Sequence, residues 1–477
     1  MKQPTLIQSL IPIVLLLTLI MVNVFFGSSD TMGGANQLSL LISAFVAGAI
    51  AISNKVSWET ISRGITSTFS NAVPAILILL MVGVLSGSWM TAGIIPTMIY
   101  YGLDVLRPDY FLPATVIITA AISLATGSSW STIATIGVAL IGIGDALGFN
   151  PAWSAGAIIS GAYFGDKVSP LSDTTNLAST VAKVDLFSHI QFMMRTTVPS
   201  IVLTLIAFTV MGFVSDSGSE TTATIAQFKG VIDSTYNISL WLLLIPVAVI
   251  YLIVKKVPAV PVLMIGSFMA IFAAGFFQQD YLLSLNGGES LSWANYYDIL
   301  TQSMYGETLP STGDPSVDDL LSTGGMVGMM NTVWLIITAM IFAGVMEASG
   351  MLERVTSIIL SRVKSPRAMV TATTGSCVLF NMTTGDQYMS IVIPGKMFHS
   401  AYEKRGMDSC LLSRTLEDGA TATSVLIPWN TCGATQATIL GVATVTYLPF
   451  AFFCWLSPLM TLFMAWTGMF QRRKTQP

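Results

Sequence analysis

Long apolar runs recur along this chain, and they constrain its fold more than any other feature. Residues 11–26 carry no charge, and comparable stretches of about 20 residues, the length that a helix needs to cross a bilayer, follow along most of the sequence. Only 10% of the 477 residues are charged, and the mean hydropathy is +0.72. The runs are continuous rather than alternating, which argues against a β-barrel. The sequence therefore predicts an all-α polytopic membrane protein with roughly ten to fourteen spans.

The loops between these runs differ in charge, and the difference predicts an orientation. Lys and Arg gather in short loops on the cytoplasmic side of a membrane. This rule places five basic segments in the cytoplasm, together with both termini: 55–63, 183–195, 255–256, 362–367 and 472–474. Segment 277–325 has seven acidic residues and no Lys or Arg, and 216–238 has a single Lys. We expect both of these segments to be external.

Several classes of function do not fit the sequence. The four cysteines, at positions 377, 410, 432 and 454, lack a C-x-x-C spacing, so neither a transition-metal site nor a disulfide framework is indicated. A net charge of -4 and the absence of a phosphate-binding G-x-x-x-x-G-K-[ST] loop argue against nucleic acid and nucleotide partners. The sequence contains neither an H-E-x-x-H motif nor a convincing Ser–His pair, so it gives no indication of an enzyme. We expect no cofactor and an ion gradient as the energy source, with an ion channel or an intramembrane enzyme as the alternatives.

Two parts of the chain, 120–180 and 378–438, repeat the same backbone-breaking residues inside apolar segments. When the sequence is shifted by 258 residues, seven matches stand out: Thr126 with Thr384, Gly127 with Gly385, Gly137 with Gly395, Gly148 with Gly406, Gly161 with Gly419, Ala162 with Ala420, and Pro170 with Pro428. The first copy leads into a basic segment, whereas the second leads into a last span that ends near Arg472. If this last span crosses the membrane once, the two copies have opposite orientations in the membrane. A hairpin at Pro449 and Pro458 would give them the same orientation. The pattern predicts inverted repeats with re-entrant hairpins and broken transmembrane helices.

This repeat divides the chain into five predicted parts. The two copies form transport repeats, and the remaining helices form a scaffold around them. The parts are 1–110 (N-terminal scaffold helices), 111–195 (first transport repeat), 196–366 (connecting scaffold with a long external loop at 278–325), 367–440 (second transport repeat) and 441–477 (C-terminal membrane helix and basic cytoplasmic tail).

The first copy begins with LATGSSWSTIATIG at 124–137, which sets Thr126, Ser128, Ser129 and Ser131 around a glycine. A helix break here frees carbonyl and hydroxyl oxygens, which suit sodium, while the restarting helix exposes N–H groups that suit an anion. The alternative interpretation is a serine-rich helix cap or a close helix contact.

The same copy continues with SGAYFGDKVSPLSDTTNLA at 160–178. Pro170 breaks the helix, and side-chain oxygens surround the restart, from Ser172, Asp173, Thr174, Thr175 and Asn176. A carboxylate such as Asp166 in this setting can exchange a proton for a cation, because desolvation favours the protonated form and a nearby cation favours the ionised form. The alternative is an aqueous loop in which Asp173 is an ordinary helix cap.

The second copy supplies NMTTGDQYMS at 381–390 and LEDGATATSVLIPWNTCGATQ at 416–436. Asp386 lies beside the glycine of the first stretch, and Pro428 breaks the second. Under the 258-residue shift, Asn430 corresponds to Ser172 and Thr431 to Asp173. Two broken elements with oxygen-rich tips are therefore expected to face each other, unless Asp386 lies in an exposed loop.

The stretch SGAYFGDKVSPLSDTTNLAS and the following VDLFSHI at 184–190 resemble the signature of NhaC-type sodium/proton antiporters. TGSSWSTIATIG, TTGDQY and PWNTCGA are also similar to patterns of that family. The resemblance implies a multi-pass exchanger of the bacterial inner membrane, elevator-like and homodimeric, with a fold distinct from that of NhaA. The same family includes malate/lactate exchangers, and related proteins move amino acids.

The resulting hypothesis is a secondary antiporter that exchanges sodium for protons. Its alternative is a sodium- or proton-coupled exchanger of organic anions, of the malate/lactate type, or of amino acids. The expected partners are sodium, protons, the lipid bilayer, a second copy of the chain and, in the alternative, a small organic acid. Asp166, Asp173 and Asp386 are the proton-carrying candidates. The full predicted binding site comprises Thr126, Ser128, Ser129, Trp130, Asp166, Ser172, Asp173, Thr174, Asn176, Asp386, Asn430 and Thr431.

Overall fold

The computed structural model describes residues 3–26, 34–214, 221–288, 290–308, 318 and 321–469. The predicted basic segment 472–474 lies outside the described residues. Within them the chain is helical, and its one β-bridge joins Thr308 and Thr323. Eight of the described helices are long and apolar enough to cross a membrane, or ten if two bent helix pairs each count as one span. The protein is therefore a multi-pass α-helical membrane protein. The count of eight lies below the predicted ten to fourteen spans, and the count of ten reaches the lower end of that range.

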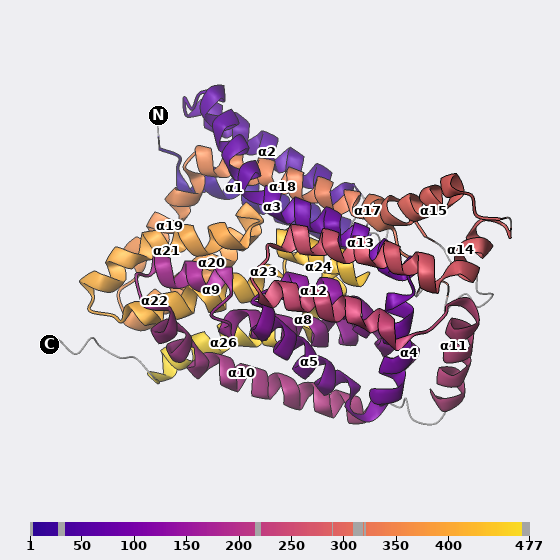
Figure 1. The fold of residues 1–477 in the computed structure, drawn as a ribbon. Coiled ribbons are helices and arrows are strands. Elements are labelled where there is room, and N and C mark those ends of the chain that lie inside the picture. The colour runs from indigo at the N-terminus through magenta and orange to yellow at the C-terminus, as the bar shows by residue number, and fades with distance from the viewer. Residues whose placement is uncertain are drawn as a thin grey trace.

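The helices outside the two copies lie above, below and to the right of them in Figure 1, where α21 and α22 of the second copy reach the left edge of the molecule. They are α1 (Leu6–Phe26), α2 (Ala35–Ser53), α3 (Trp58–Thr91), α4 (Ile94–Val105), α10 (Leu186–Val214), α11 (Thr221–Thr235), α12 (Leu244–Val254), α13 (Ala259–Phe277), α14 (Gln279–Leu285), α15 (Trp293–Tyr305), α17 (Gly325–Gly328), α18 (Met330–Ala348), α19 (Met351–Arg362), α25 (Thr444–Tyr447) and α26 (Phe452–Thr467). The segment that contains Pro449 and Pro458 forms a pair of helices bent by 57° rather than a straight span.

Two segments predicted as external loops contain helices. Segment 216–238 contains α11, and the predicted loop 278–325 contains α14 and α15. α15 begins where the Ser292 hydroxyl accepts the Asn295 N–H at 3.2 Å, which is an ordinary N-cap. Acidic composition indicates the side of the membrane on which a segment lies, and it does not exclude helix formation.

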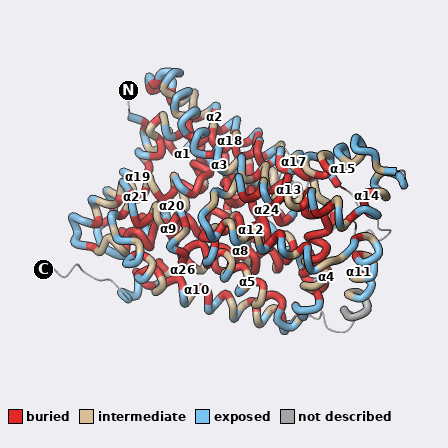
Figure 2. The backbone as a smooth tube through the Cα atoms, in the orientation of Figure 1, coloured by how far each residue is buried: buried red, intermediate tan, exposed pale blue. Residues whose placement is uncertain are grey.

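The helices of the two copies form the interior of the molecule. They are α5 (Phe111–Thr126), α6 (Ser129–Thr132), α7 (Val138–Ala146), α8 (Pro151–Val168) and α9 (Asp173–Val181) in the first copy, and α20 (Pro366–Thr384), α21 (Gln387–Lys404), α22 (Ser409–Leu416), α23 (Ala422–Ser424) and α24 (Thr431–Leu440) in the second. Buried backbone follows α8 and α24 through the middle of the molecule, while the outer helices are more exposed (Figure 2).

The ends of these helices recur at the predicted shift of 258 residues. α5 and α20 end at Thr126 and Thr384, each before a glycine with positive φ. The capping residues of the next helices correspond as well: Ser128 with Asp386, Asn150 with Asp408, and Ser172 with Asn430. Each copy also contains one π-helical turn, at Ile133–Gly137 and Glu417–Thr421. These turns fall at different positions within the copies.

Side-chain contacts inside the copies correspond too. The Ser123 hydroxyl donates to the Ala162 carbonyl at 2.6 Å, and 258 residues later the Asn381 amide donates to the Ala420 carbonyl at 2.7 Å. A Cβ on Gly161 would meet the Val116 carbonyl oxygen at 2.2 Å, so α5 and α8 approach each other closely there. The same helices of the second copy approach at Gly419, the counterpart of Gly161.

Gly161→Ala tests the close approach of α5 and α8. The added methyl group would also lie 2.1 Å from the Thr119 hydroxyl oxygen, so the helices must separate, at a cost of about 1–3 kcal/mol. We expect a lower midpoint of thermal unfolding in detergent. Gly375→Ala, at a helical position with no atom within 4 Å of the new methyl, is the matched control and should not lower it. Equal midpoints for Gly161→Ala and the wild type would contradict the contact.

Candidate functional site

The first break lies between α5 and α6. Gly127 ends α5 at φ 71°, and the Ser128 hydroxyl caps α6 by accepting the Ser131 N–H at 3.2 Å. A Cβ on Gly127 would lie 2.6 Å from the Leu171 Cβ, in the loop between α8 and α9. The two breaks of the first copy therefore pack directly against each other, and only glycine satisfies both the backbone angle and the contact.

Asp166 joins these two breaks. It lies near the end of α8 and is 5% exposed. Its Oδ2 accepts hydrogen bonds from the Ser129 N–H at 3.1 Å and the Ser129 hydroxyl at 2.7 Å, at the start of α6. Its Oδ1 has no hydrogen-bond partner among the described residues. One carboxylate oxygen is thus positioned by the protein, and the other remains open to a proton or a cation.

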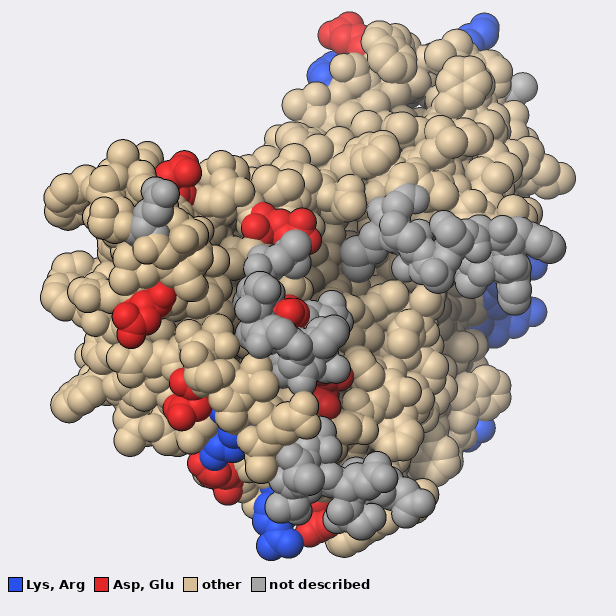
Figure 3. Space-filling model, turned by 90° about the vertical axis from the view of Figure 1, so that its right-hand side faces the viewer, with Lys and Arg blue, Asp and Glu red and all other residues tan. Residues whose placement is uncertain are grey.

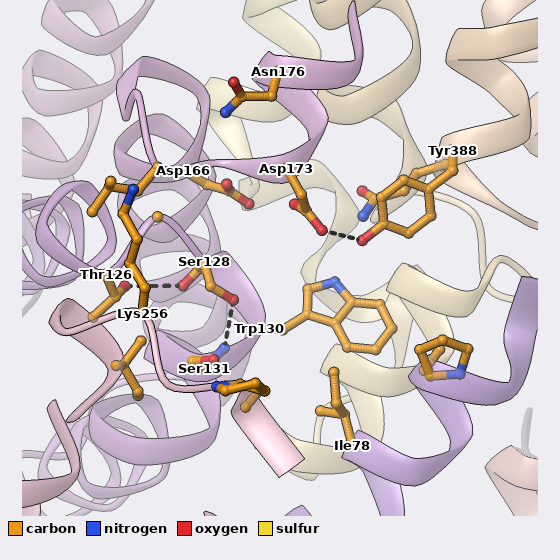
Figure 4. A pocket seen from close by; sticks show the side chains of 18 of the residues that line it. Ile78, Thr126, Ser128, Trp130, Ser131, Asp166, Asp173, Asn176, Lys256 and Tyr388 are labelled. Carbon is orange, nitrogen blue, oxygen red and sulfur yellow. Dashed lines mark hydrogen bonds between the residues drawn. The ribbon is translucent and has the colours of Figure 1, made fainter. Parts of the chain in front are cut away.

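Asp173 is the first residue of α9, and it bridges the two copies. The cap of this helix is Ser172, which accepts the Thr175 N–H at 3.4 Å, so the alternative of Asp173 as an ordinary cap is wrong. The Tyr388 hydroxyl donates to Asp173 Oδ2 at 2.6 Å (Figure 4). Asp173 also interacts electrostatically with Asp166. Asp173 itself is exposed, at the junction of the two copies.

The second copy contributes Asp386 from its corresponding break. Asp386 caps α21, with Oδ1 accepting the Met389 N–H at 2.9 Å, and it is 2% exposed. It is therefore not in an exposed loop. Asn430 caps α24, and its amide donates to Asn381 at 3.2 Å. The Thr431 N–H donates to the Gly385 carbonyl at 2.8 Å, which ties the two breaks of this copy together.

A cavity of about 650 Å³ lies between the two copies and the helices α3, α12 and α13. Eight of the predicted site residues line it: Thr126, Ser128, Trp130, Asp166, Asp173, Asn176, Asp386 and Thr431. Figure 4 shows Asp166, Asp173, Trp130 and Tyr388 around this space. The cavity brings together residues from both copies, as expected for broken elements that face each other.

Four predicted site residues do not line the cavity. Ser129 bonds Asp166, Ser172 and Asn430 cap helices, and the Thr174 hydroxyl lies 3.1 Å from that of Ser172. These four residues are in positions to hold the breaks in shape rather than to face the cavity.

Several lining residues were not predicted. Tyr388 corresponds to Trp130 under the 258-residue shift, so a position-by-position comparison of the copies would have found it. Asn71 on α3 and Lys256 in the turn between α12 and α13 come from outside the copies, and no sequence signal marks them. The described lining includes three Asp and a single Lys, so the cavity favours cations.

A second polar cluster lies behind the cavity. Lys167, next to Asp166 in sequence, pairs with Asp418 instead, and its ammonium also donates to the Ser457 hydroxyl at 2.5 Å. Asp418 further accepts hydrogen bonds from Thr196 and Thr461. Arg414 completes the cluster, with its Nε 4.0 Å from Asp418 Oδ2. All the charged members of this cluster are at most 1% exposed. The charges of Lys167 and Asp418 compensate each other, and Arg414 adds a second positive charge beside them.

Comparison with known proteins identifies the family. The model of the Na+/H+ antiporter family matches residues 161–469. The chain belongs to the Na+/H+ antiporter family. It is 36% identical to the Na+/H+ antiporter NhaC of Alkalihalophilus pseudofirmus over 95% of both chains. It is also 36% identical to the malate-2H+/Na+-lactate antiporter of Bacillus subtilis, over 91% of this chain and 90% of that protein.

A third relative is the arginine/ornithine antiporter ArcD of Halobacterium salinarum, which is 36% identical to this chain over 98% of this chain and 93% of that protein. Among solved structures, Neisseria gonorrhoeae MtrF matches 97% of this chain and 95% of its own, with 14% identity and a TM-score of 0.36. That TM-score is too low to decide how the helices are arranged. The family comparison confirms the resemblance to NhaC-type antiporters, and its members are transporters.

Paired substitutions test the buried cluster. Lys167→Met and Asp418→Asn each leave a buried charge without its main partner, which costs about 3–5 kcal/mol for such pairs. We expect each single variant to lower the midpoint of thermal unfolding. The decrease in the double variant should be clearly smaller than the sum of the decreases in the two single variants. The exposed pair Arg63 and Glu59, 3.7 Å apart, is the control, and removing it should change little. Additive losses at Lys167 and Asp418 would show that the two side chains do not interact.

Proposed function

We propose that this protein exchanges sodium for protons at the cavity between the two copies. The observation that carries the proposal is the state of Asp166, a buried carboxylate with one oxygen held by Ser129 and the other open. A carboxylate in this position binds a proton or sodium but has little room for both. Alternate occupation by the two ions, on the two sides of the membrane, is sufficient for antiport.

The other lining residues supply what sodium requires. Sodium is a hard cation and prefers oxygen ligands. Asp173 and Asp386 add carboxylates, and Thr126, Ser128 and Thr431 add hydroxyl groups around the same space. We propose that the eight lining residues form the binding site and that one of the three candidates Asp166, Asp173 and Asp386, in the first place Asp166, carries the proton. Ser129, Ser172, Thr174 and Asn430 have positioning roles in this proposal.

We also propose that the two copies are inverted repeats. Reciprocal contacts between the copies support a two-fold relation. In such a relation, a contact from the first copy to the second is matched by an equivalent contact from the second copy to the first. A Cβ on Gly137 would meet Leu440 of the second copy at 3.4 Å, and a Cβ on Gly395 would meet Val181 of the first at 2.4 Å. Trp130 of the first copy and Tyr388 of the second, which correspond under the shift, line the same cavity. An axis in the membrane plane would make the repeats inverted and put the site near the midplane.

The charge distribution supports the proposed orientation. α1 begins and α26 ends at the same end of the molecule, opposite the end with α11, α14 and α15 (Figure 1). On the face with these three helices, Asp and Glu are scattered from top to bottom over the left and middle of the view, and Lys and Arg lie at the top, along the right edge and at the lower left (Figure 3). We propose that this acidic face is external and that both termini are cytoplasmic, in a bacterial inner membrane.

The five-part division of the chain is part of the proposal. Helices α1, α2, α3 and α18 share a buried apolar cluster, which includes Leu16, Leu40 and Ile336 and extends to Phe380 and Ala434 of the second copy. We propose that these helices form a scaffold, against which the two transport repeats (111–195 and 367–440) move as one body in an elevator-like cycle. Because the resemblance to NhaC-type antiporters implies a dimer, we also propose a homodimer.

A second candidate function is favoured by the size of the cavity. A volume of about 650 Å³ is within the range of small-molecule sites, roughly 300–1,000 Å³, and exceeds what a sodium ion fills. Lys256 at the cavity wall would suit the carboxylate of an organic acid or an amino acid. The B. subtilis and H. salinarum relatives carry substrates of these classes in their names. The alternative is therefore an organic-anion or amino-acid exchanger coupled to sodium or protons.

Asp166→Asn tests the carboxylate on which the proposal rests, and Asp173→Asn tests its neighbour. Each substitution removes a charge at nearly constant volume, so we expect normal membrane insertion and an exchange rate at least about 100-fold lower, or about 2.7 kcal/mol in the barrier. The measurement uses proteoliposomes with a sodium gradient and a pH-sensitive dye inside. Asp298→Asn, on exposed α15, is the control and should exchange like the wild type. Wild-type exchange in both cavity variants would refute the assignment.

The same proteoliposomes separate the two candidate functions. We expect sodium to move protons without any organic solute, because the site needs only oxygen ligands and one titrating carboxylate. Malate, lactate, arginine and ornithine are then added singly, and Lys256→Gln is compared with the wild type. Proton movement that requires an organic solute and falls in Lys256→Gln would replace sodium/proton exchange with the second candidate.

A further inference from the structure

Glu417 is a carboxylate enclosed inside the second copy, away from the cavity lining. It is the first residue of the π-helical turn Glu417–Thr421, and it is 0% exposed. Neither of its carboxylate oxygens makes a hydrogen bond of normal geometry with a described residue, although the Thr421 hydroxyl on the same turn interacts with it. Its neighbour Asp418 is equally buried but accepts hydrogen bonds from Lys167, Ser457 and two threonine hydroxyls. The same turn thus holds one carboxylate that is fully paired and one that is not.

The charges around Glu417 do not compensate it. The charged and titratable groups that interact with it are Lys167 and Asp166 on α8, Asp418 on its own turn and Cys377 on α20. Lys167 is bonded to Asp418, and the other three groups are acidic. Helices α9, α21, α22, α23 and α26 also pack on the turn, and α22 carries a second buried cation, Arg414, whose Nε lies 4.0 Å from Asp418 Oδ2. Lys167 and Arg414 are thus both engaged with Asp418, and neither is hydrogen-bonded to Glu417.

An ionised carboxylate without a partner is very costly in a buried site, so Glu417 must hold a proton in this conformation. Close packing keeps the site closed, because a Cβ on Gly419 would lie 3.1 Å from the Cys377 Cβ and 3.2 Å from the Thr374 Cα. Glu417 is therefore closed off from water in this conformation.

The fold itself does not require a carboxylate here. Under the 258-residue shift, Glu417 corresponds to Ile159 of the first copy, which is also fully buried and apolar. The same helix position is thus filled by an aliphatic side chain in one copy and by an acid in the other. Since an apolar residue would be cheaper to bury, the acid is expected to have a role that packing does not explain. π-helical turns inside α-helices are frequent at functional sites, which is consistent with such a role.

We propose that Glu417 is a second proton-binding site, occupied in this conformation and emptied during the transport cycle. On release the O–H bond breaks, the electron pair stays on the carboxylate, the proton passes to water, and the buried cations Lys167 and Arg414 of the adjoining cluster can balance the new charge. This inference rests on the proposed sodium/proton exchange. Together with one proton on Asp166, it gives two protons per sodium and one net charge per cycle. Exchange would then respond to the membrane potential, at about 2.3 kcal/mol per 100 mV.

The first test is infrared spectroscopy of the purified wild type and variants in detergent, comparing light and heavy water at neutral pH. A protonated buried carboxyl group shows a C=O stretching band that shifts on deuteration. We expect a band that is present in the wild type and in Glu403→Gln, an exposed-glutamate control on α21, and absent in Glu417→Gln. A band unchanged in Glu417→Gln would overturn the proposal. This readout does not need transport, so it remains decisive even if sodium/proton exchange is disproved.

The second test determines the number of protons exchanged per sodium ion in proteoliposomes. With sodium and proton gradients opposed, the membrane potential at which net flux stops gives this number. We expect two protons per sodium in the wild type and in Glu403→Gln, and one in Glu417→Gln, which would therefore lose its response to voltage. Two protons per sodium in Glu417→Gln would overturn the proposal. If Glu417→Gln fails to fold, Glu417→Asp replaces it, because this variant keeps the carboxyl group. We expect Glu417→Asp to shift the infrared band. An unshifted band would assign the band to another residue and contradict the proposal.

Discussion

The structure depends on one constraint: backbone that is broken inside a membrane protein must find partners for its free N–H and C=O groups. Here the partners are capping side chains, Ser128 and Ser172 in the first copy and Asp386 and Asn430 in the second. Once these caps are made, Asp166 can bind the N–H of Ser129 at the restarted helix and still keep one oxygen open. The same polar groups that make the breaks tolerable therefore also shape the ion site that we propose.

Adjacent residues on α8 connect this site to the buried cluster behind it. Successive side chains on an α-helix are about 100° apart, so Asp166 and Lys167 point to different surroundings. Asp166 faces the cavity, whereas Lys167 reaches Asp418, 251 residues away in sequence. Any movement of α8 relative to the second copy would change both environments at once. A change in the charge of the cavity can thus be transmitted to the cluster that contains Glu417.

The sequence predicted what depends on local pattern and missed what depends on packing over long distances. Apolar runs, Gly127, Gly385 and the prolines locate the helices and breaks, because their effects are local. Eight of the predicted site residues line the cavity for the same reason, since they lie next to those breaks. Lys256, Asn71 and the partner of Lys167 were not predictable, because no local signal shows which distant helices meet. The inverted arrangement, the elevator-like movement and the dimer remain proposals.

Proton release on sodium binding tests most directly whether one carboxylate serves both ions. Purified protein in a weakly buffered detergent solution receives sodium while a sensitive electrode or dye follows the pH. Shared use of Asp166 predicts that sodium displaces protons into the solution and that Asp166→Asn abolishes this release. Sodium binding without proton release, or equal release in the variant, would show that the two ions use separate sites.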